Sequence, residues 1–244
     1  GNGFVGDQNT PGVITAADIL TNDFDPDGDS LIITGVTALG GSGSIATLNG
    51  DQTVTFDTNG SIIGLGAGQN AAVAFNYDIS DGNGGTSTAR ADLLFAGLND
   101  APVLAGAGAN QFTTDAATTT TFDVATMVSG LISDLDNSAF EGIAVTGFTG
   151  AGQWESSTDG VTFNPISALS DTNALLLAVF SGSQLRYIPD GTTAETPTLT
   201  YRAWDVSAGS NGNLADASIT GGENAFSTAT DTITGTNNNH YITR

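Results

Sequence analysis

The segment FNYDISD, residues 75–81, alternates apolar and polar side chains and ends on an aspartate. Because successive side chains of a strand point to opposite faces, Phe75, Tyr77 and Ile79 would share one face. The segment therefore predicts a half-buried strand with that face in a core, followed by a turn at Asp81. The same pattern returns as LTYRAWD at 199–205, which predicts a second copy of the same β-module.

Two more matches precede that strand in the same order. ITGV at 33–36 resembles VTGF at 145–148, and VTF at 54–56 resembles VTF at 161–163. The second copy is the longer one, and its insertions are expected around residues 168–182. Alternation and turn residues predict strands at 30–37, 53–57, 72–80 and 87–95 in the first copy, and at 142–149, 160–164, 184–188, 197–205 and 226–234 in the second.

Length and composition agree with two all-β domains. A chain of 244 residues suits two sandwiches better than one. Its 33 glycines and its low content of charged residues, 12%, favour short strands and turns over amphipathic helices. The linker is placed at LNDAP, residues 98–102, because Pro102 cannot donate to a ladder. We predict two tandem Greek-key β-sandwich domains, at residues 1–99 and 100–236, and a polar tail at 237–244.

The charge balance excludes several classes of function. The chain has 26 acidic residues against four arginines and no lysine, for a formal net charge of -22. Nucleic acid is excluded as a partner, because no basic face can be assembled. Cysteine is absent, which excludes disulfides, thiolate catalysis and cysteine zinc sites. No apolar run approaches the roughly 18 residues of a membrane span, so membrane insertion is not expected.

Catalysis is not expected either. His240 is the only histidine and lies in the polar tail, so neither a Ser-His-Asp triad nor a histidine metal site is predicted. Glu141 and Glu155 could form a glycosidase pair only across a cleft, and nothing in the sequence places them so. We predict that the chain is not an enzyme.

The densest acidic cluster is NDFDPDGD, residues 22–29. Its carboxylates Asp25, Asp27 and Asp29 alternate through a segment that Pro26 and Gly28 force to turn. Such a loop gathers oxygens on one side, as a calcium ion with six to eight oxygen ligands requires. A solvated Asp-Gly turn is the alternative. The repulsion between so many like charges at close range favours calcium.

A second acidic set is expected around the linker. In a Greek-key sandwich the loops after the second and sixth strands lie at the same end, together with the entry of the chain. The acids after the corresponding strands should therefore meet, and in the second copy the linker residues should join them. The predicted calcium ligands are Asp25, Asp27, Asp29 and Asp81 in the first set, and Asn99, Asp100, Asp134, Asp136 and Asp205 in the second. We expect calcium to stabilise both modules and to fix the angle between them.

Trp204 is a candidate ligand contact. It alternates out of phase with Tyr201 and Ala203, so it should lie on the opposite face of the strand, beside Arg202. An exposed tryptophan next to an arginine is a plausible glycan or protein contact. The alternative is that an inserted loop covers it.

Three runs carry a family resemblance: ITAADILTNDFDPDGDSLIITGV at 14–36, FNYDISDGNGGTSTARADL at 75–93 and LNDAPVL at 98–104. They resemble the bacterial cadherin-like tandem repeats of giant secreted adhesins and biofilm surface proteins. DLDNSAFEGIAVTGF at 134–148, with LTYRAWD, resembles a longer Ig-like module found in the same kind of protein.

The resemblance implies a β-sandwich spacer with calcium (Ca2+) at domain ends, secreted to the bacterial cell surface and acting in attachment or assembly. The implied partners are neighbouring modules of the same protein and other copies of it in a fibre or layer. The alternative function is a carbohydrate-binding second domain that contacts surface glycans. Such repeats usually begin with an apolar strand, whereas this chain begins at Gly1, so the first strand is expected to be short or missing. That leaves open whether a neighbouring chain supplies it by β-augmentation.

Overall fold

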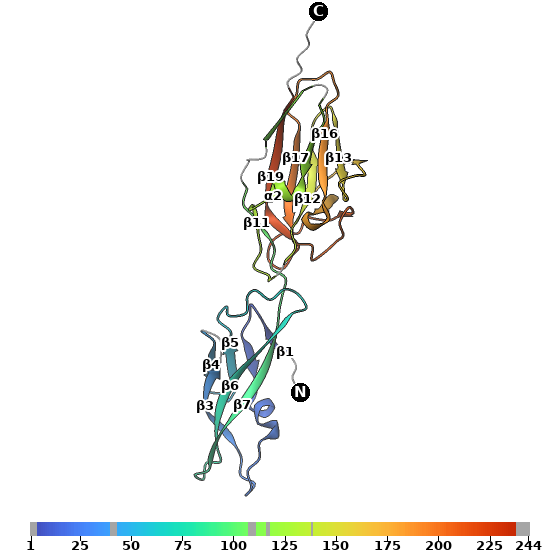
Figure 1. Cartoon of the computed structure of the whole chain (residues 1–244). Coiled ribbons are helices and arrows are strands. Elements are labelled where there is room, and N and C mark those ends of the chain that lie inside the picture. The colour runs from blue at the N-terminus through green and yellow to red at the C-terminus, as the bar shows by residue number, and fades with distance from the viewer. Residues whose placement is uncertain (1–3, 40–42, 107–110, 116–117, 138, 238–244) are drawn as a thin grey trace, which may run out of the picture. The chain divides into compact units, whose positions relative to one another are not determined.

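The computed structural model describes residues 4–39, 43–106, 111–115, 118–137 and 139–237 (Figure 1). The chain divides into two compact units, Gly1–Leu98 and Asn99–Arg244, called here unit 1 and unit 2. Each is built from packed β-sheets with only short helices, which confirms the all-β sandwich fold. Asn99 groups with unit 2, one residue before the boundary suggested by the sequence.

Unit 1 combines a four-stranded sheet, ordered β1-β7-β6-β3, with a three-stranded sheet, ordered β2-β5-β4. The long β6–β7 hairpin dominates the first sheet (Figure 1). The elements are β1 (Phe4–Asp7), β2 (Gly12–Ile14), α1 (Ala16–Ile19), η1 (Leu20–Asn22), β3 (Ile32–Leu39), β4 (Ile45–Leu48), β5 (Val54–Asp57), β6 (Asn70–Ser80) and β7 (Thr86–Ala96).

The core of unit 1 lies between these two sheets. Phe56 comes from β5, and Phe75 and Phe95 come from β6 and β7; all three are fully buried. The ring centroid of Phe56 lies 6.2 Å from that of Phe75 and 6.0 Å from that of Phe95. Phe75, Tyr77 and Ile79 are buried together, so the predicted apolar face of this strand is confirmed.

The leading segment of unit 1 is short, but it is not missing. β1 pairs in parallel with β7, and β2 pairs antiparallel with β5, so this segment is divided between the two sheets. A Cβ on Gly6 would lie only 2.8 Å from the ring of Phe95, so glycine is needed for the close approach. The chain therefore supplies its own first strand, in two parts.

Unit 2 combines a four-stranded sheet, ordered β10-β16-β13-β14, with a six-stranded sheet, ordered β18-β15-β12-β17-β19-β9, and has a separate pair, β11-β8. The elements are β8 (Val103–Leu104), β9 (Gln111–Thr114), β10 (Thr120–Asp123), α2 (Val124–Val128), β11 (Ile132–Ser133), β12 (Gly142–Phe148), β13 (Gln153–Ser157), β14 (Asn164–Pro165), β15 (Ala174–Ala178), η2 (Val179–Ser181), β16 (Gln184–Ile188), β17 (Thr198–Trp204), β18 (Leu214–Ala215) and β19 (Phe226–Asn237). β19 extends into the first residue of the predicted tail, and Asn237 is buried.

The six-stranded sheet of unit 2 is buried on both faces. Leu175 and Leu177 of β15 face the main core, which also contains Trp154. Leu176, between them in sequence, joins a second cluster with Trp204. Residues 205–225 supply Ala217 and Ala225 to that cluster and so add a third layer. A strand covered on both faces has a continuous apolar sequence, which explains the ALLLA of β15.

The extra length of the second copy lies partly elsewhere than expected. Residues 174–178, inside the range 168–182 assigned to insertions, form β15 of the main sheet. A long segment, 205–225, separates β17 from β19, whereas β6 and β7 are joined by the short loop 81–85. The additional residues of the second copy therefore include a segment that covers its main sheet.

One sequence match between the copies is also a structural match. β3 shifts register against β6 between Ile33 and Gly35, and β12 shifts register against β17 between Val145 and Gly147. The two irregularities occupy equivalent positions of ITGV and VTGF. A β-bulge of this kind is a defined feature of a sheet, so its recurrence supports a common module.

The match of VTF at 54–56 to VTF at 161–163 is wrong as a strand prediction. The first belongs to β5, but the second belongs to no strand. Asp159 Oδ1 accepts the backbone N–H groups of Val161 at 2.8 Å and Thr162 at 2.7 Å, so these amides serve a turn and not a ladder. Val161 is 81% exposed.

Candidate functional site

The second predicted acidic set comes together at one end of unit 2. Asp134 and Asp136 follow β11, Asp205 follows β17, and Asn99 and Asp100 precede β8. Asn99 Nδ2 donates to Asp205 Oδ2 at 2.8 Å, and the backbone N–H of Asp100 donates to Asp136 Oδ2 at 3.0 Å. The topology thus gathers these residues, which are up to 106 positions apart, at one place.

Two carboxylate oxygens of this cluster have no hydrogen-bond partner within the described residues. They are Asp134 Oδ2 and Asp136 Oδ1, and both atoms are buried. The other oxygen of Asp134 accepts the backbone N–H of Asp136 at 2.8 Å. An unsatisfied buried oxygen costs about 1–3 kcal/mol, and more when it is charged. These two oxygens therefore need a donor or a cation.

The electrostatics of the cluster are unfavourable for its carboxylates. Burial raises the pKa of Asp134, and repulsion from Asp136, Asp205 and Asp100 raises it further. A hydrogen bond from the Asp136 amide lowers it in part. Burial also raises the pKa of Asp136, with repulsion from Asp100 and Asp205. The neighbouring negative groups therefore make ionisation of Asp134 and Asp136 harder.

No arginine of the described residues neutralises this cluster. Arg90 pairs with Asp92 at 2.6 Å, Arg186 with Glu155 at 2.5 Å and Arg202 with Asp171 at 3.4 Å. The chain has no lysine, and Arg244 and His240 lie outside the described residues. Among the described residues, no cationic side chain therefore compensates the charge of the cluster.

The residue types fit a hard cation such as calcium. Four carboxylates and the Asn99 amide offer oxygen ligands, and calcium takes six to eight of them. As the side chains stand, no three carboxylates of the described residues converge closely enough to hold one metal ion. Binding would therefore require the side chains to turn towards one another, which would give the two unsatisfied oxygens a partner.

The first predicted set also lies together, but as a more exposed loop. Asp25 Oδ1 accepts the backbone N–H groups of Asp27 at 2.8 Å and Asp29 at 3.2 Å. Asn83 Nδ2 donates to Asp29 Oδ2 at 2.7 Å, and Asp25 and Asp81 line one shallow pocket. The predicted approach of Asp81 to this loop is therefore observed. The carboxylates of Asp25, Asp29 and Asp81 accept hydrogen bonds from nearby amides, as in the solvated-turn alternative, so the case for a cation is weaker here.

Tyr77 anchors the start of this acidic loop, and we expect Tyr77→Phe to lower the unfolding free energy of unit 1 by roughly 1.5–3 kcal/mol. The Tyr77 hydroxyl donates to Asp23 Oδ2 at 2.7 Å. Burial and this bond raise the pKa of Tyr77 to about 12, above its ordinary value of 10.0. The hydroxyl of Tyr77 then contributes fully to the unfolding free energy of unit 1 below pH 10, and this contribution is lost as the pH rises through about 12. Denaturant titrations of the wild type and Tyr77→Phe at about pH 8 and about pH 11.5 should show a smaller difference in unfolding free energy at the higher pH. A difference that stays constant would contradict this account.

Trp204 and Arg202 are not an exposed ligand platform. Trp204 does lie on the face opposite Tyr201 and Ala203, but it is fully buried and its Nε1 donates to the carbonyl of Ala208 at 2.7 Å. Residues 205–225 cover it, so the covering-loop alternative is correct and the exposed-contact prediction is wrong.

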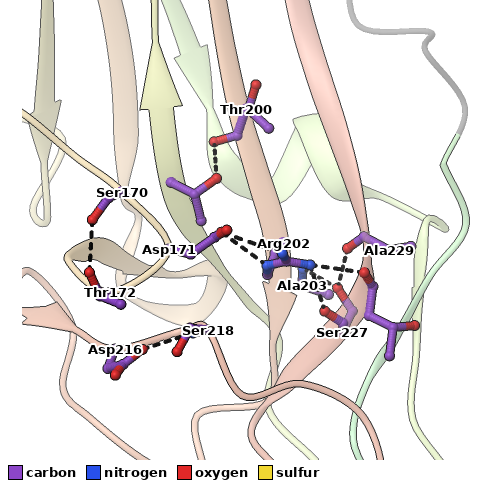
Figure 2. Close-up of polar contacts among 12 residues, drawn as sticks. Ser170, Asp171, Thr172, Thr200, Arg202, Ala203, Asp216, Ser218, Ser227 and Ala229 are labelled. Atoms are coloured by element: carbon purple, nitrogen blue, oxygen red, sulfur yellow. Dashed lines mark hydrogen bonds and ion pairs between the residues drawn. The ribbon is translucent and has the colours of Figure 1, made fainter.

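Arg202 is held by groups of unit 2 itself. Its guanidinium pairs with Asp171 and donates to the backbone carbonyls of Ser227 and Thr228 (Figure 2). The arginine side chain is only 14% exposed. Arg202 therefore links β17 to β19 and to the loop before β15.

The structure adds polar groups that sequence reasoning did not identify. Asn99 Nδ2 also lies 3.4 Å from the carbonyl of Asn224, and the backbone N–H of Ala101 donates to the carbonyl of Gly222 at 2.8 Å. Both carbonyls belong to the segment 205–225, whose course no local pattern predicts. In unit 1 the added residue is Asn83, whose position two residues after Asp81 was the available signal.

Glu155, one of the two glutamates considered for catalysis, is paired with Arg186. Glu155 is buried, and Arg186 Nε donates to its Oε2 at 2.6 Å. The Arg186 guanidinium also lies over the ring of Phe163, 3.9 Å from its centroid. The backbone carbonyl of Glu141 accepts from Val179. Glu155 is thus part of a structural ion pair.

Comparison with known proteins finds a family similarity for unit 1. Residues 3–96 match the family model of the cadherin-like domain. Unit 1 is therefore similar to cadherin-like domains over almost its whole length. This match ends before unit 2 begins.

No curated protein matches the chain. Among solved structures the chain is similar to protocadherin gamma B2 extracellular cadherin domains 3–6, at 11% identity and with a TM-score of 0.38. The similarity covers 88% of this chain and 42% of that one, so the chain spans less than half the length of that solved chain. In the described part of the chain no helix is both long and apolar enough to cross a membrane.

Proposed function

We propose that the chain is a pair of calcium-stiffened structural modules of a bacterial extracellular surface protein, acting in attachment to, or assembly at, the cell surface. The observation that carries the calcium assignment is the pair of buried, unpartnered oxygens of Asp134 and Asp136. They lie within a cluster of four carboxylates, and the described arginines are all paired elsewhere.

The cadherin-like match of residues 3–96 supports the adhesion-type role. The acidic motifs and their resemblance to bacterial repeat modules support secretion and the cell-surface location. The proposed partners are neighbouring modules of the same protein and other copies of it in a fibre or layer.

The position of the cluster in the sequence explains how calcium would stiffen the chain. Asn99 and Asp100 follow directly after Leu98, the last residue of unit 1. An ion that binds them together with Asp134, Asp136 and Asp205 would fix the first residues of unit 2 to its body. Less chain would then be free to rotate between the modules.

The direct test is calcium binding by isothermal titration calorimetry. We expect the wild-type chain to bind calcium and Asp134→Asn/Asp136→Asn to lose affinity at the unit 2 site by at least about tenfold, because affinity follows the ligand charge of the site. Asp25→Asn/Asp27→Asn is the comparison variant: it changes residues of unit 1 alone, asparagine can keep the turn at position 25, and the affinity of the unit 2 site should be unchanged. Equal calcium binding by the wild type and Asp134→Asn/Asp136→Asn would exclude this site.

A further inference from the structure

Unit 2 has a groove of about 380 Å³ on the side where its two main sheets end. One wall comes from β13 and β14, with Ser156 and Asn164, and the other from β15 and β18, with Leu175 and Leu214. β14 and β18 are the edge strands of their sheets. The volume is within the range of roughly 300–1,000 Å³ found for small-molecule sites.

The lining of this groove carries no formal charge. It includes no aspartate, glutamate or arginine, in a chain with 26 acidic residues. A cation or an anion would find no counter-charge here. The groove therefore suits an uncharged ligand.

Five of the six polar side chains that line the groove are free to bind a ligand. Ser156, Thr158, Asn164, Ser167 and Asn213 line it, and none of their side chains makes a hydrogen bond to another described residue. All except Ser156 are exposed. The apolar side chains that line the groove are Ile166, Leu169, Leu175 and Leu214.

We propose that this groove binds a short neutral oligosaccharide. A sugar ring presents hydroxyl groups at its rim and C–H groups on its faces, which matches amides and hydroxyls arranged around apolar side chains. The groove is also built in advance of binding. Asn211 Oδ1 accepts the backbone N–H of Ala178 at 2.9 Å, which fixes one wall, and Gly212 allows that loop to approach Thr158 closely.

An extended peptide fits this place less well. Peptides that add to a sheet edge need a row of free backbone groups. β14 and β18 are two residues long, and Pro165 of β14 has no N–H to donate. The groove therefore favours hydrogen bonding by side chains.

The test uses the full chain in calcium-containing buffer. Neutral oligosaccharides of β-1,4-glucan, β-1,3-glucan, α-1,4-glucan and β-1,4-linked N-acetylglucosamine are titrated while backbone amide shifts are followed by NMR. We expect at least one of them to shift amides of residues 156–167 and 211–214. Asn164→Ala/Asn213→Ala should weaken that binding by about 5- to 100-fold, the effect of losing two neutral hydrogen bonds. Asn9→Ala/Asn70→Ala, in unit 1, is the matched control and should bind as the wild type does.

Three outcomes would overturn the proposal. They are no shifts with any of the four sugars, shifts that map outside the groove, and unchanged affinity in Asn164→Ala/Asn213→Ala with its amide spectrum still folded. Groove shifts caused by an extended peptide and by none of the sugars would likewise reject a sugar site. None of these results bears on calcium binding, which concerns other residues.

Discussion

Removal of calcium is expected to lower the melting temperature of unit 2. A ligand that binds only the folded state adds about 2.7 kcal/mol when present at 100 times its dissociation constant. For a domain of this size each kcal/mol corresponds to roughly 2–4 °C, so a shift of about 5–10 °C should follow. Differential scanning calorimetry in millimolar calcium and in excess chelator measures it. Small-angle scattering on the same samples should show a wider spread of dimensions with chelator.

Asp134→Asn/Asp136→Asn provides the internal control. The variant removes two repelling charges, so it should be more stable than the wild type in chelator and should gain little from calcium. Asp25→Asn/Asp27→Asn should leave the response of unit 2 intact. Identical melting curves and scattering profiles with and without calcium would refute the calcium-dependent role of both acidic sets.

Trp204→Ala is expected to destabilise unit 2 by about 3–5 kcal/mol, the range for truncating a large buried aromatic side chain. The side chain is fully buried between the main sheet and residues 205–225, and its indole N–H satisfies the carbonyl of Ala208. Truncation would leave a cavity and an unpaired carbonyl. Urea unfolding followed by circular dichroism measures the loss.

Two comparison variants separate burial from surface effects. Trp204→Phe keeps most of the apolar volume and should cost less than the alanine variant. Leu214→Ala removes a side chain that is 52% exposed and should have a small effect. A Trp204→Ala protein as stable as the wild type would mean that the third layer does not cover the sheet in solution.

The strands of both units were largely predictable because their signal is local. Phe75, Tyr77 and Ile79 alternate, and so do Leu199, Tyr201 and Ala203; each set is buried on one face of a strand. Period two follows from the geometry of a single strand and needs no knowledge of its neighbours. The acidic sets were predictable for a related reason, since loops at equivalent positions of a sandwich lie at the same end.

The errors arose where a side-chain contact, local in one case and distant in the other, overrides the alternation of the strand. Val161 and Phe163 have the composition of a strand, but the carboxylate of Asp159 takes up the nearby backbone amides. Trp204 has the alternation of a surface residue on an exposed face. Residues 205–225, which have only a two-residue strand, bury it. Neither effect leaves a trace in local periodicity.

The parallel strand pairs have a mechanical consequence. β1 runs parallel to β7, the last strand of unit 1, and β9 runs parallel to β19, the last strand of unit 2. A tension applied to the two ends of unit 1 pulls β1 and β7 in opposite directions along their length, and the same holds for β9 and β19 of unit 2 once the preceding β8–β11 pair has opened. The hydrogen bonds between them are then loaded in shear and share the force, so they must rupture together. A strand pair peeled from one end would lose them one at a time, so this arrangement suits modules that are held under tension.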